Sequence, residues 1–306
     1  EKYKTSMMLY RKKKDKSNEA YCLISLGSIE QTVNNDYKKA ELLYNEAVTI
    51  AKKLSNEYVL AFCYDQMRFL YRSTGRTELA EENSLKALDM YKKLENWKQV
   101  ASALSGIAYD AYYVYGDLTK AMNFYDQAQA IADTLKDKVV LANIIVGRAS
   151  VYEQRGEFAK ALETIDKGYE LYRAVDNEWG IAGTYIDRGN IYKLMTEYEI
   201  AMRYQYKADS MYVAMGTEYA RLAPLANIGE NYVAQANYPK GLEFSLKSYD
   251  IMKKAGDMDA NVCIIKGNIG EIYYLMNNYP ESDKWLKDGL ETSRKVSARR
   301  PMIGIL

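Results

Sequence analysis

Small residues recur in this sequence every 40 or 41 positions. A first series contains only Ala, Gly and Ser, and a second series of the same kind follows it by seven residues. The first series is Ala40, Ala80, Ala121, Ala161, Ala201, Gly241 and Ser282; the second is Ala47, Ala87, Ala128, Gly168, Ala208, Ser248 and Gly289. Tyrosine stands nine residues before the first series in six of the seven units, with Gln31 in the remaining one. A repeat of this length predicts a stacked array of similar units.

Each unit has the pattern of two amphipathic helices. In the fifth unit, Tyr185, Gly189 and Tyr192 follow helical i, i+4, i+7 spacing and predict a first helix. Ala201 and Ala208 lie on one stripe of a second helix. Small residues on that stripe let two helices approach closely, because a larger side chain would overpack the contact at about 1–3 kcal/mol. The expected fold is therefore all-α.

Composition removes several classes of function. The formal charge of the 306-residue chain is +1, whereas binding to a phosphate backbone requires a strongly basic surface, so no nucleic-acid partner is expected. The chain has no histidine, and Cys22, Cys63 and Cys263 form no CxxC pair, so we expect no metal, no cofactor and no catalytic activity. No apolar run approaches the roughly 18 residues of a membrane span. Localisation stays open between cytoplasm and periplasm.

The spacing of these residues resembles the tetratricopeptide repeat (TPR) family. The matching residues of the fifth unit are Tyr185, Gly189, Tyr192, Tyr198, Ala201 and Ala208, and those of the sixth are Leu225, Ile228, Gly229, Tyr232, Tyr238 and Gly241. Arg68 and Tyr109 replace the glycine in the second and third units, and the period exceeds the roughly 34 residues usual for the family. The resemblance implies a right-handed α-solenoid, or superhelix, of about seven TPR-like repeats.

The period also suggests where the repeats begin and end. Seven repeats are predicted over 20–302, and residues 1–19 are expected to be the second helix of a preceding partial repeat. The predicted limits are 20–60, 61–101, 102–141, 142–181, 182–221, 222–262 and 263–302. Residues 303–306 are expected to start an eighth repeat, which would make the chain part of a longer protein with a frayed end after Arg299.

The resemblance implies that first helices line the inner, ligand-binding face. The candidate residues on that face are Asp65, Phe69, Asp110, Tyr113, Asp187, Asn190, Asn227, Glu230, Asn268, Glu271 and Tyr274, and the cations Arg72 and Lys193 occupy inner positions too. Asn227 and Asn268 are expected to hold a peptide backbone, because an amide side chain both donates and accepts hydrogen bonds. The acids favour a neutral or basic partner over an acid-ended one. The alternative, that these polar residues are simply solvated, remains open.

Two functions fit this pattern. The first is a non-catalytic scaffold that binds a protein or peptide, as the sensing or docking region of a larger bacterial regulatory protein such as a sensor kinase or transcription regulator. The second is a structural assembly adaptor that binds partners through its convex surface or its ends. A kinase or helix-turn-helix segment in the full reading frame would favour the first.

Overall fold

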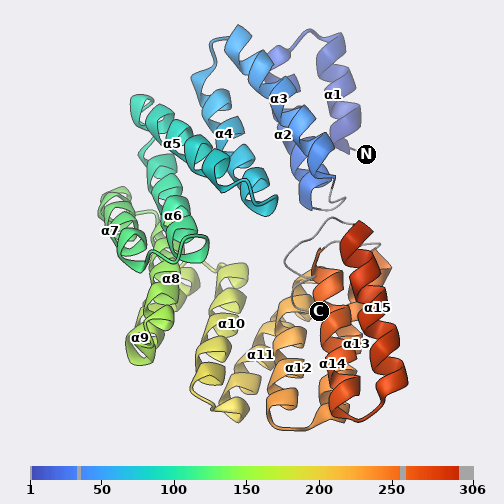
Figure 1. Cartoon of the computed structure of the whole chain (residues 1–306). Coiled ribbons are helices and arrows are strands. Elements are labelled where there is room, and N and C mark those ends of the chain that lie inside the picture. The colour runs from blue at the N-terminus through green and yellow to red at the C-terminus, as the bar shows by residue number, and fades with distance from the viewer. Residues whose placement is uncertain (1, 33–35, 256–259, 296–306) are drawn as a thin grey trace. The chain divides into compact units, whose positions relative to one another are not determined.

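The computed structural model describes residues 2–32, 36–255 and 260–295, and this part of the chain is entirely helical (Figure 1). The expected all-α fold of paired helices is confirmed. The described residues form fifteen α-helices and one 3-10 helix. Their bounds are α1 (Lys2–Lys12), α2 (Lys16–Thr32), α3 (Tyr37–Lys53), α4 (Glu57–Ser73), α5 (Thr77–Lys93), α6 (Trp97–Tyr113), α7 (Leu118–Leu135), α8 (Lys138–Gln154), α9 (Phe158–Arg173), α10 (Glu178–Leu194), α11 (Tyr198–Ala214), η1 (Glu218–Arg221), α12 (Leu222–Ala234), α13 (Tyr238–Ala255), α14 (Ala260–Leu275) and α15 (Tyr279–Lys295).

The chain divides into two compact units, Glu1–Arg155 and Gly156–Leu306. In the first unit, helices pack as the pairs α2/α3, α4/α5 and α6/α7, and each pair also contacts the next helix along the chain. In the second unit the pairs are α10/α11, α12/α13 and α14/α15. The division falls between α8 and α9, within the fourth predicted repeat. Among the described residues, no helix combines the length and apolar character that a membrane span requires.

The helices begin slightly earlier than the predicted repeats. The helix expected within residues 1–19 is α1, and it packs against α2. First helices α2, α4 and α6 begin at Lys16, Glu57 and Trp97, about one helical turn before the predicted starts at 20, 61 and 102. Residues 303–306 and the segment after Arg299 lie outside the described residues, so the expected eighth repeat stays a prediction.

Both series of small residues lie in the helix contacts. All fourteen are buried, among them Ala121, Ala161 and Ala201 at 0 % exposure. Gly189, on the first helix of the fifth repeat, shows how closely the two helices of a pair approach. A Cβ atom added at Gly189 on α10 would lie 2.3 Å from the Nε2 atom of Gln205 on α11. The sequence pattern therefore records the close approach of paired helices.

The turns inside the repeats share one backbone conformation. Gly75 and Gly116 end their turns with φ of 72° and 68°, a left-handed conformation that glycine adopts without steric cost. The same turn position in later repeats is occupied by Thr196 and Ala236, with φ of 63° and 57°. Many helices then start on an Asp or Asn cap, as in α7, where the Asp117 side chain accepts from the Lys120 amide.

Candidate functional site

The structure places every candidate residue on a first helix. In the first unit these helices are α4 and α6, and in the second they are α10, α12 and α14. The first set is Asp65, Phe69, Asp110 and Tyr113; the second is Asp187, Asn190, Asn227, Glu230, Asn268, Glu271 and Tyr274. Because the units are separate compact bodies, each set is described by itself.

In the first unit, Asp110 belongs to a cluster of paired charges. Its two carboxylate oxygens accept from Arg68 Nη1 at 3.0 Å and from Arg72 Nη1 at 2.9 Å. Arg68 is 4 % exposed and Asp110 is 8 % exposed. Asp65 lies at the edge of this cluster, and burial raises the pKa of its carboxyl group. Both oxygens of Asp110 are therefore already bound by arginines, so the negative charge of this candidate residue is balanced within the protein.

Arg68 occupies the position where most repeats have a small residue, and its neighbours explain how it fits. On the next first helix, α6, a Cβ atom at Gly106 would lie 2.8 Å from the Arg68 Nη2 atom, so a larger residue there would displace the guanidinium. The guanidinium also lies over the ring of Phe69, 3.9 Å from its centroid. Phe69 is therefore partly covered by Arg68, and Gly106 leaves space beside the guanidinium.

Tyr113 is the most accessible candidate of the first unit. Its side chain is 51 % exposed, and its ring stacks on Tyr109 with a centroid separation of 5.3 Å. Arg72 lies over the other ring of this pair, 5.0 Å from the Tyr109 centroid. The result is an aromatic surface held in place by a cation.

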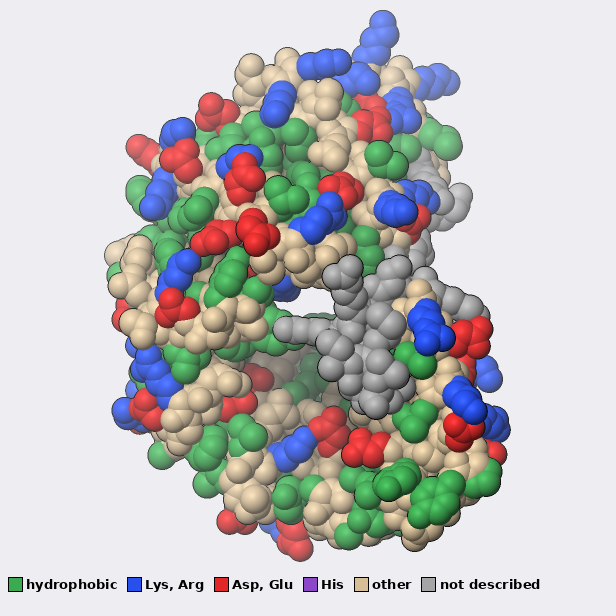
Figure 2. All heavy atoms as spheres, viewed as in Figure 1, with side chains coloured by type: hydrophobic (Ala, Val, Ile, Leu, Met, Phe, Trp, Pro, Cys, Tyr) green, Lys and Arg blue, Asp and Glu red, His purple; other side chains and the backbone are tan. Residues whose placement is uncertain are grey.

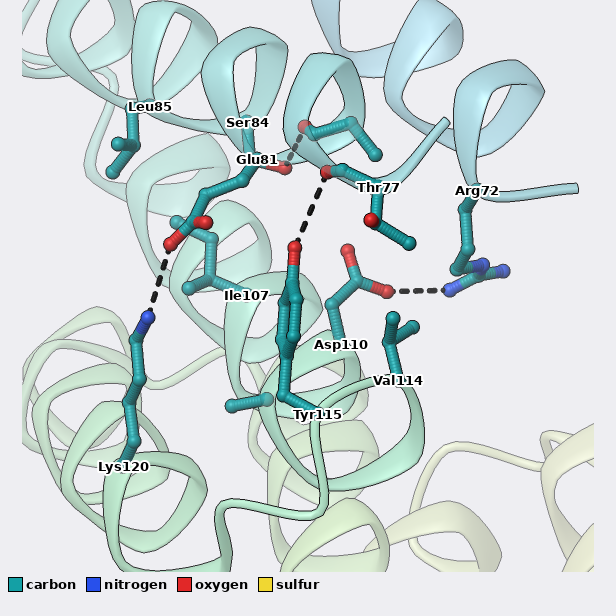
Figure 3. Close-up of a pocket in the computed structure, with 12 residues that line it drawn as sticks. Arg72, Thr77, Glu81, Ser84, Leu85, Ile107, Asp110, Val114, Tyr115 and Lys120 are labelled. Atoms are coloured by element: carbon teal, nitrogen blue, oxygen red, sulfur yellow. Dashed lines mark hydrogen bonds and ion pairs between the residues drawn. The ribbon is translucent and has the colours of Figure 1, made fainter. Parts of the chain in front are cut away.

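A small pocket lies beside this cluster, between the α4/α5 and α6/α7 pairs (Figure 3). Three contacts between the repeats frame it: Arg72 with Asp110, the Tyr115 hydroxyl donating to the Thr77 carbonyl at 3.2 Å, and Lys120 with Glu81 at 3.0 Å. Its volume is about 20 Å³, roughly the space of one water molecule.

Ala111 forms part of the wall of this pocket. It stands ten residues before the small residue of the first series, where α4, α8, α10 and α14 carry the larger Leu70, Val151, Ile191 and Ile272. A larger side chain at position 111 would therefore occupy part of the pocket. The pocket is too small to hold a peptide side chain.

In the second unit, three amide side chains join α10, α11 and α12. Gln205 Nε2 donates to the Ile186 carbonyl at 3.2 Å and to Asn190 Oδ1 at 3.1 Å, and Asn227 Nδ2 donates to the same oxygen at 2.8 Å. Asn190 Nδ2 and Asn227 Oδ1 make no hydrogen bond to any described residue. One donor group and one acceptor thus remain on neighbouring first helices.

Gln205 is a residue that the sequence analysis missed. It is fully buried on α11, four residues after Ala201. Other second helices carry Tyr44, Tyr125, Ile165 and Leu286 at this position. A glutamine at a position that is usually apolar was a visible signal of a buried hydrogen-bond network.

The acids of the second unit differ in their pairing. Glu230 on α12 forms an ion pair with Lys193 on α10, so its negative charge is also balanced within the protein. Glu271 occupies the equivalent position on α14, but the cation position on α12 is occupied by Val233. Glu271 is exposed, and no described residue forms an ion pair with it.

The remaining candidates of the second unit are Asn268 and Tyr274 on α14 and Asp187 on α10. Asn268 is partly buried on α14, and Tyr274 is 59 % exposed, with its ring edge-on to Tyr279 at 5.6 Å. Asp187 is partly buried on α10. Burial, together with the nearby charge of Asp187, raises the pKa of Tyr172 to about 12.

Comparisons with known proteins agree with this architecture. The family model described as tetratricopeptide repeat matches residues 265–299. The STAND protein with a tetratricopeptide repeat sensor from Pyrococcus horikoshii matches with a TM-score of 0.64 at 16 % identity, over 99 % of this chain and 47 % of that chain. The fold of this chain is therefore TPR-like.

Other TPR structures match over most of both chains. A Rap protein complexed with competence and sporulation factor has a TM-score of 0.64 at 13 % identity, covering 95 % of this chain and 79 % of that chain. The apo form of the quorum sensor NprR from B. thuringiensis has a TM-score of 0.56 at 15 % identity, covering 97 % and 81 %. A search of curated proteins gives no match. At such low identities the shared property is the TPR fold.

Proposed function

We propose that this TPR array is a binding scaffold that holds an extended peptide segment along α10, α12 and α14. The observation that carries the proposal is the free donor and acceptor of Asn190 and Asn227, followed one repeat later by the unpaired acid Glu271. Amide groups suit a peptide backbone, which needs one donor and one acceptor for each residue. Asn190 Nδ2 would donate to a peptide carbonyl, and Asn227 Oδ1 would accept from a peptide N–H.

The ion pairs of the acidic residues limit which of them can select a basic partner. Asp110 and Glu230 are balanced by cations, so a preference for a basic segment rests on Glu271. A lysine or arginine of the ligand would pair with this carboxylate. Because Glu271 is exposed, one such pair contributes no more than about 1 kcal/mol. Tyr274, one turn further along α14, offers apolar area to the same ligand.

The wider role that fits is the sensing or docking region of a larger bacterial regulatory protein. In support, the chain is similar in fold to the repeat sensor of a STAND protein and to a Rap protein that binds competence and sporulation factor. The non-catalytic part of the proposal rests on a sequence without histidine or a known catalytic motif.

A peptide array tests the binding site. Octapeptides with Lys, Gln or Glu at each position are probed with the purified chain, and the tightest one is titrated by fluorescence anisotropy. We expect selection of Lys in one position, weaker binding by Asn227→Ala, and loss of the Lys preference in Glu271→Gln. Val233→Lys places a cation where Arg72 and Lys193 stand in other repeats, so it should neutralise Glu271 and abolish the same preference.

Glu163→Gln is the matched control, because Glu163 is an exposed acid on the second helix α9. It should bind like the unchanged protein. The proposal fails if the array selects no Lys, or if binding is unchanged in Asn227→Ala, Glu271→Gln and Val233→Lys while circular dichroism shows that all three are folded.

A further inference from the structure

The exposed side of α11 carries two cations and a tyrosine. Arg203 and Lys207 are one helical turn apart and both exposed, and the side chain of Tyr206 is 39 % exposed between them. These residues, with Ile200 and Tyr204, line a shallow open hollow on this helix. None of them belongs to the candidate set on the first helices.

Aromatic contacts extend this surface to the next repeat. The hydroxyl oxygens of Tyr206 and Tyr232 on α12 lie 3.4 Å apart, and the Nζ atom of Lys240 on α13 lies 5.1 Å from the centre of the Tyr232 ring. Lys207 lies over Tyr204 in the same manner, at 5.2 Å. We call Arg203, Tyr206, Lys207, Tyr232 and Lys240 the α11–α13 surface.

The nearby acids are paired with other cations. Glu243 pairs with Lys247 at 2.6 Å, and Asp209 pairs with Arg221 at 2.7 Å. Asp166 likewise pairs with Arg188. By contrast, no described residue forms an ion pair with Arg203, Lys207 or Lys240. Glu199, one turn before Arg203, is exposed and does not pair with it. The α11–α13 surface therefore presents a local positive charge, although the whole chain is nearly neutral.

We propose that the α11–α13 surface docks an acidic segment of a partner protein that also carries aromatic or apolar side chains. Unpaired surface cations attract a segment of opposite charge and set its orientation. The exposed tyrosine supplies the large, rigid contact area that interface aromatics provide. Charge complementarity is thus the property that selects this occupant.

The same charges argue against nucleic acid. Three cations are few for a phosphate backbone, and the exposed acid Glu199 flanks them. On the face of the molecule in Figure 2, basic and acidic side chains are likewise interspersed, without a continuous band of one sign. A nucleic-acid strand needs a longer run of cations than these three residues supply.

This surface is independent of the peptide site proposed above. Its cations come from the second helices α11 and α13, whereas the peptide site uses α10, α12 and α14. An array that used both would hold two partners at once: a basic segment on its first helices and an acidic one on its second helices. Failure of either proposal leaves the other standing, because they share no residue.

The test uses the full chain and a fluorescein-labelled dodecapeptide of eight Glu and four Phe. Binding is followed by fluorescence anisotropy at 50 mM and 300 mM NaCl, beside a peptide with Gln in place of Glu and a twelve-nucleotide oligouridine. The variant pair is Arg203→Glu with Lys207→Glu. Lys167→Glu is the matched control, since Lys167 has the same position on α9 as Lys207 on α11 but is paired with Glu163.

We expect the acidic peptide to bind the unchanged chain more tightly than the Gln peptide or the oligouridine, and more weakly at high salt. The double variant should lower its affinity about tenfold or more, Tyr206→Ala should lower it less, and Lys167→Glu should leave it unchanged. The proposal is overturned if the acidic peptide does not bind at 50 mM NaCl, if Lys167→Glu weakens binding as much as the double variant, or if oligouridine binds more tightly than the peptide.

Discussion

Lys193 on α10 forms an ion pair with Glu230 on α12, and this contact joins the first helices of two consecutive repeats. Arg72 on α4 and Asp110 on α6 form the same contact in the first unit, at equivalent positions of their repeats. Asp110 and Glu230, which are candidate ligand-binding residues, therefore also connect neighbouring repeats. Among the described repeats, Glu271 alone has the acid at this position while the cation position of the preceding repeat is occupied by Val233.

The two contacts should differ greatly in their effect on stability. Asp110→Ala leaves the guanidinium of Arg68 buried with only the more distant Asp65, and should lower the free energy of unfolding by about 3–5 kcal/mol. Glu230→Ala removes a partly exposed pair and should cost less than about 1 kcal/mol. Urea unfolding followed by circular dichroism measures both. Equal losses would show that the Asp110 cluster is solvated.

The small residues of the helix contacts should not accept larger side chains. Ala201→Leu should destabilise the protein by about 1–3 kcal/mol, because Ala201 is fully buried against the first helix of its repeat. Glu199→Leu, an exposed residue in the first turn of the same helix, is the control and should change stability by less than about 0.5 kcal/mol. Similar urea midpoints for the two variants would contradict this assignment of the helix faces.

Replacing one buried asparagine should stabilise the protein. Asn231 is 0 % exposed, and both polar atoms of its side chain lack a hydrogen-bond partner. Leu70, Ile191 and Ile272 occupy the same position in other repeats. Asn231→Leu should therefore raise the free energy of unfolding by about 1–3 kcal/mol, measured by urea unfolding.

Gln205→Leu is the comparison for that variant, because Gln205 is equally buried and its Oε1 atom lacks a partner, but its Nε2 atom donates two hydrogen bonds. It should lower stability, since Asn190 loses one of its partners. If Asn231→Leu destabilises the protein as well, a polar group that binds Asn231 has been overlooked.

The stability should depend on pH through Glu153. Burial raises the pKa of this carboxyl group above its ordinary 4.5 in the folded state. The ionised form then destabilises the fold above the folded pKa, and the penalty disappears as the pH falls through that value towards 4.5. Glu153→Gln should therefore be more stable than the unchanged protein at pH 7, and the difference should vanish near pH 3.

Glu163→Gln is the comparison variant, and its effect on stability at pH 7 should be opposite to that of Glu153→Gln. A hydrogen bond from Lys167 lowers the pKa of Glu163, so its carboxylate stabilises the fold above the ordinary pKa and loses this effect as the pH falls through the lowered value. The variant should be slightly less stable at pH 7. Urea unfolding at both pH values tests the pair, and the same sign for both variants would contradict the assigned causes.

Much of the architecture followed from the sequence alone. The 40-residue spacing of small residues and tyrosines identified the helix pairs, because each helix must bury one stripe against its partner. The same periodicity placed all the candidate residues on first helices, as the structure has them. The first residue of each helix could not be predicted as well, because the repeating pattern marks the packed stripe and not the first turn. Helices α2 and α4, for example, begin at Lys16 and Glu57, about one turn before the predicted starts.

The pairing of charges was decided by the tertiary structure. The partners of Asp110, Arg68 and Arg72, lie one repeat away in the sequence, and only the folded array brings the three side chains together. The periodic sequence determined which face each side chain occupies. Whether a charge is balanced, as at Glu230, or available, as at Glu271, was decided by the distance between side chains of successive repeats. An ion pair requires a separation of a few ångströms, and the spacing of residues along the chain does not specify such a distance.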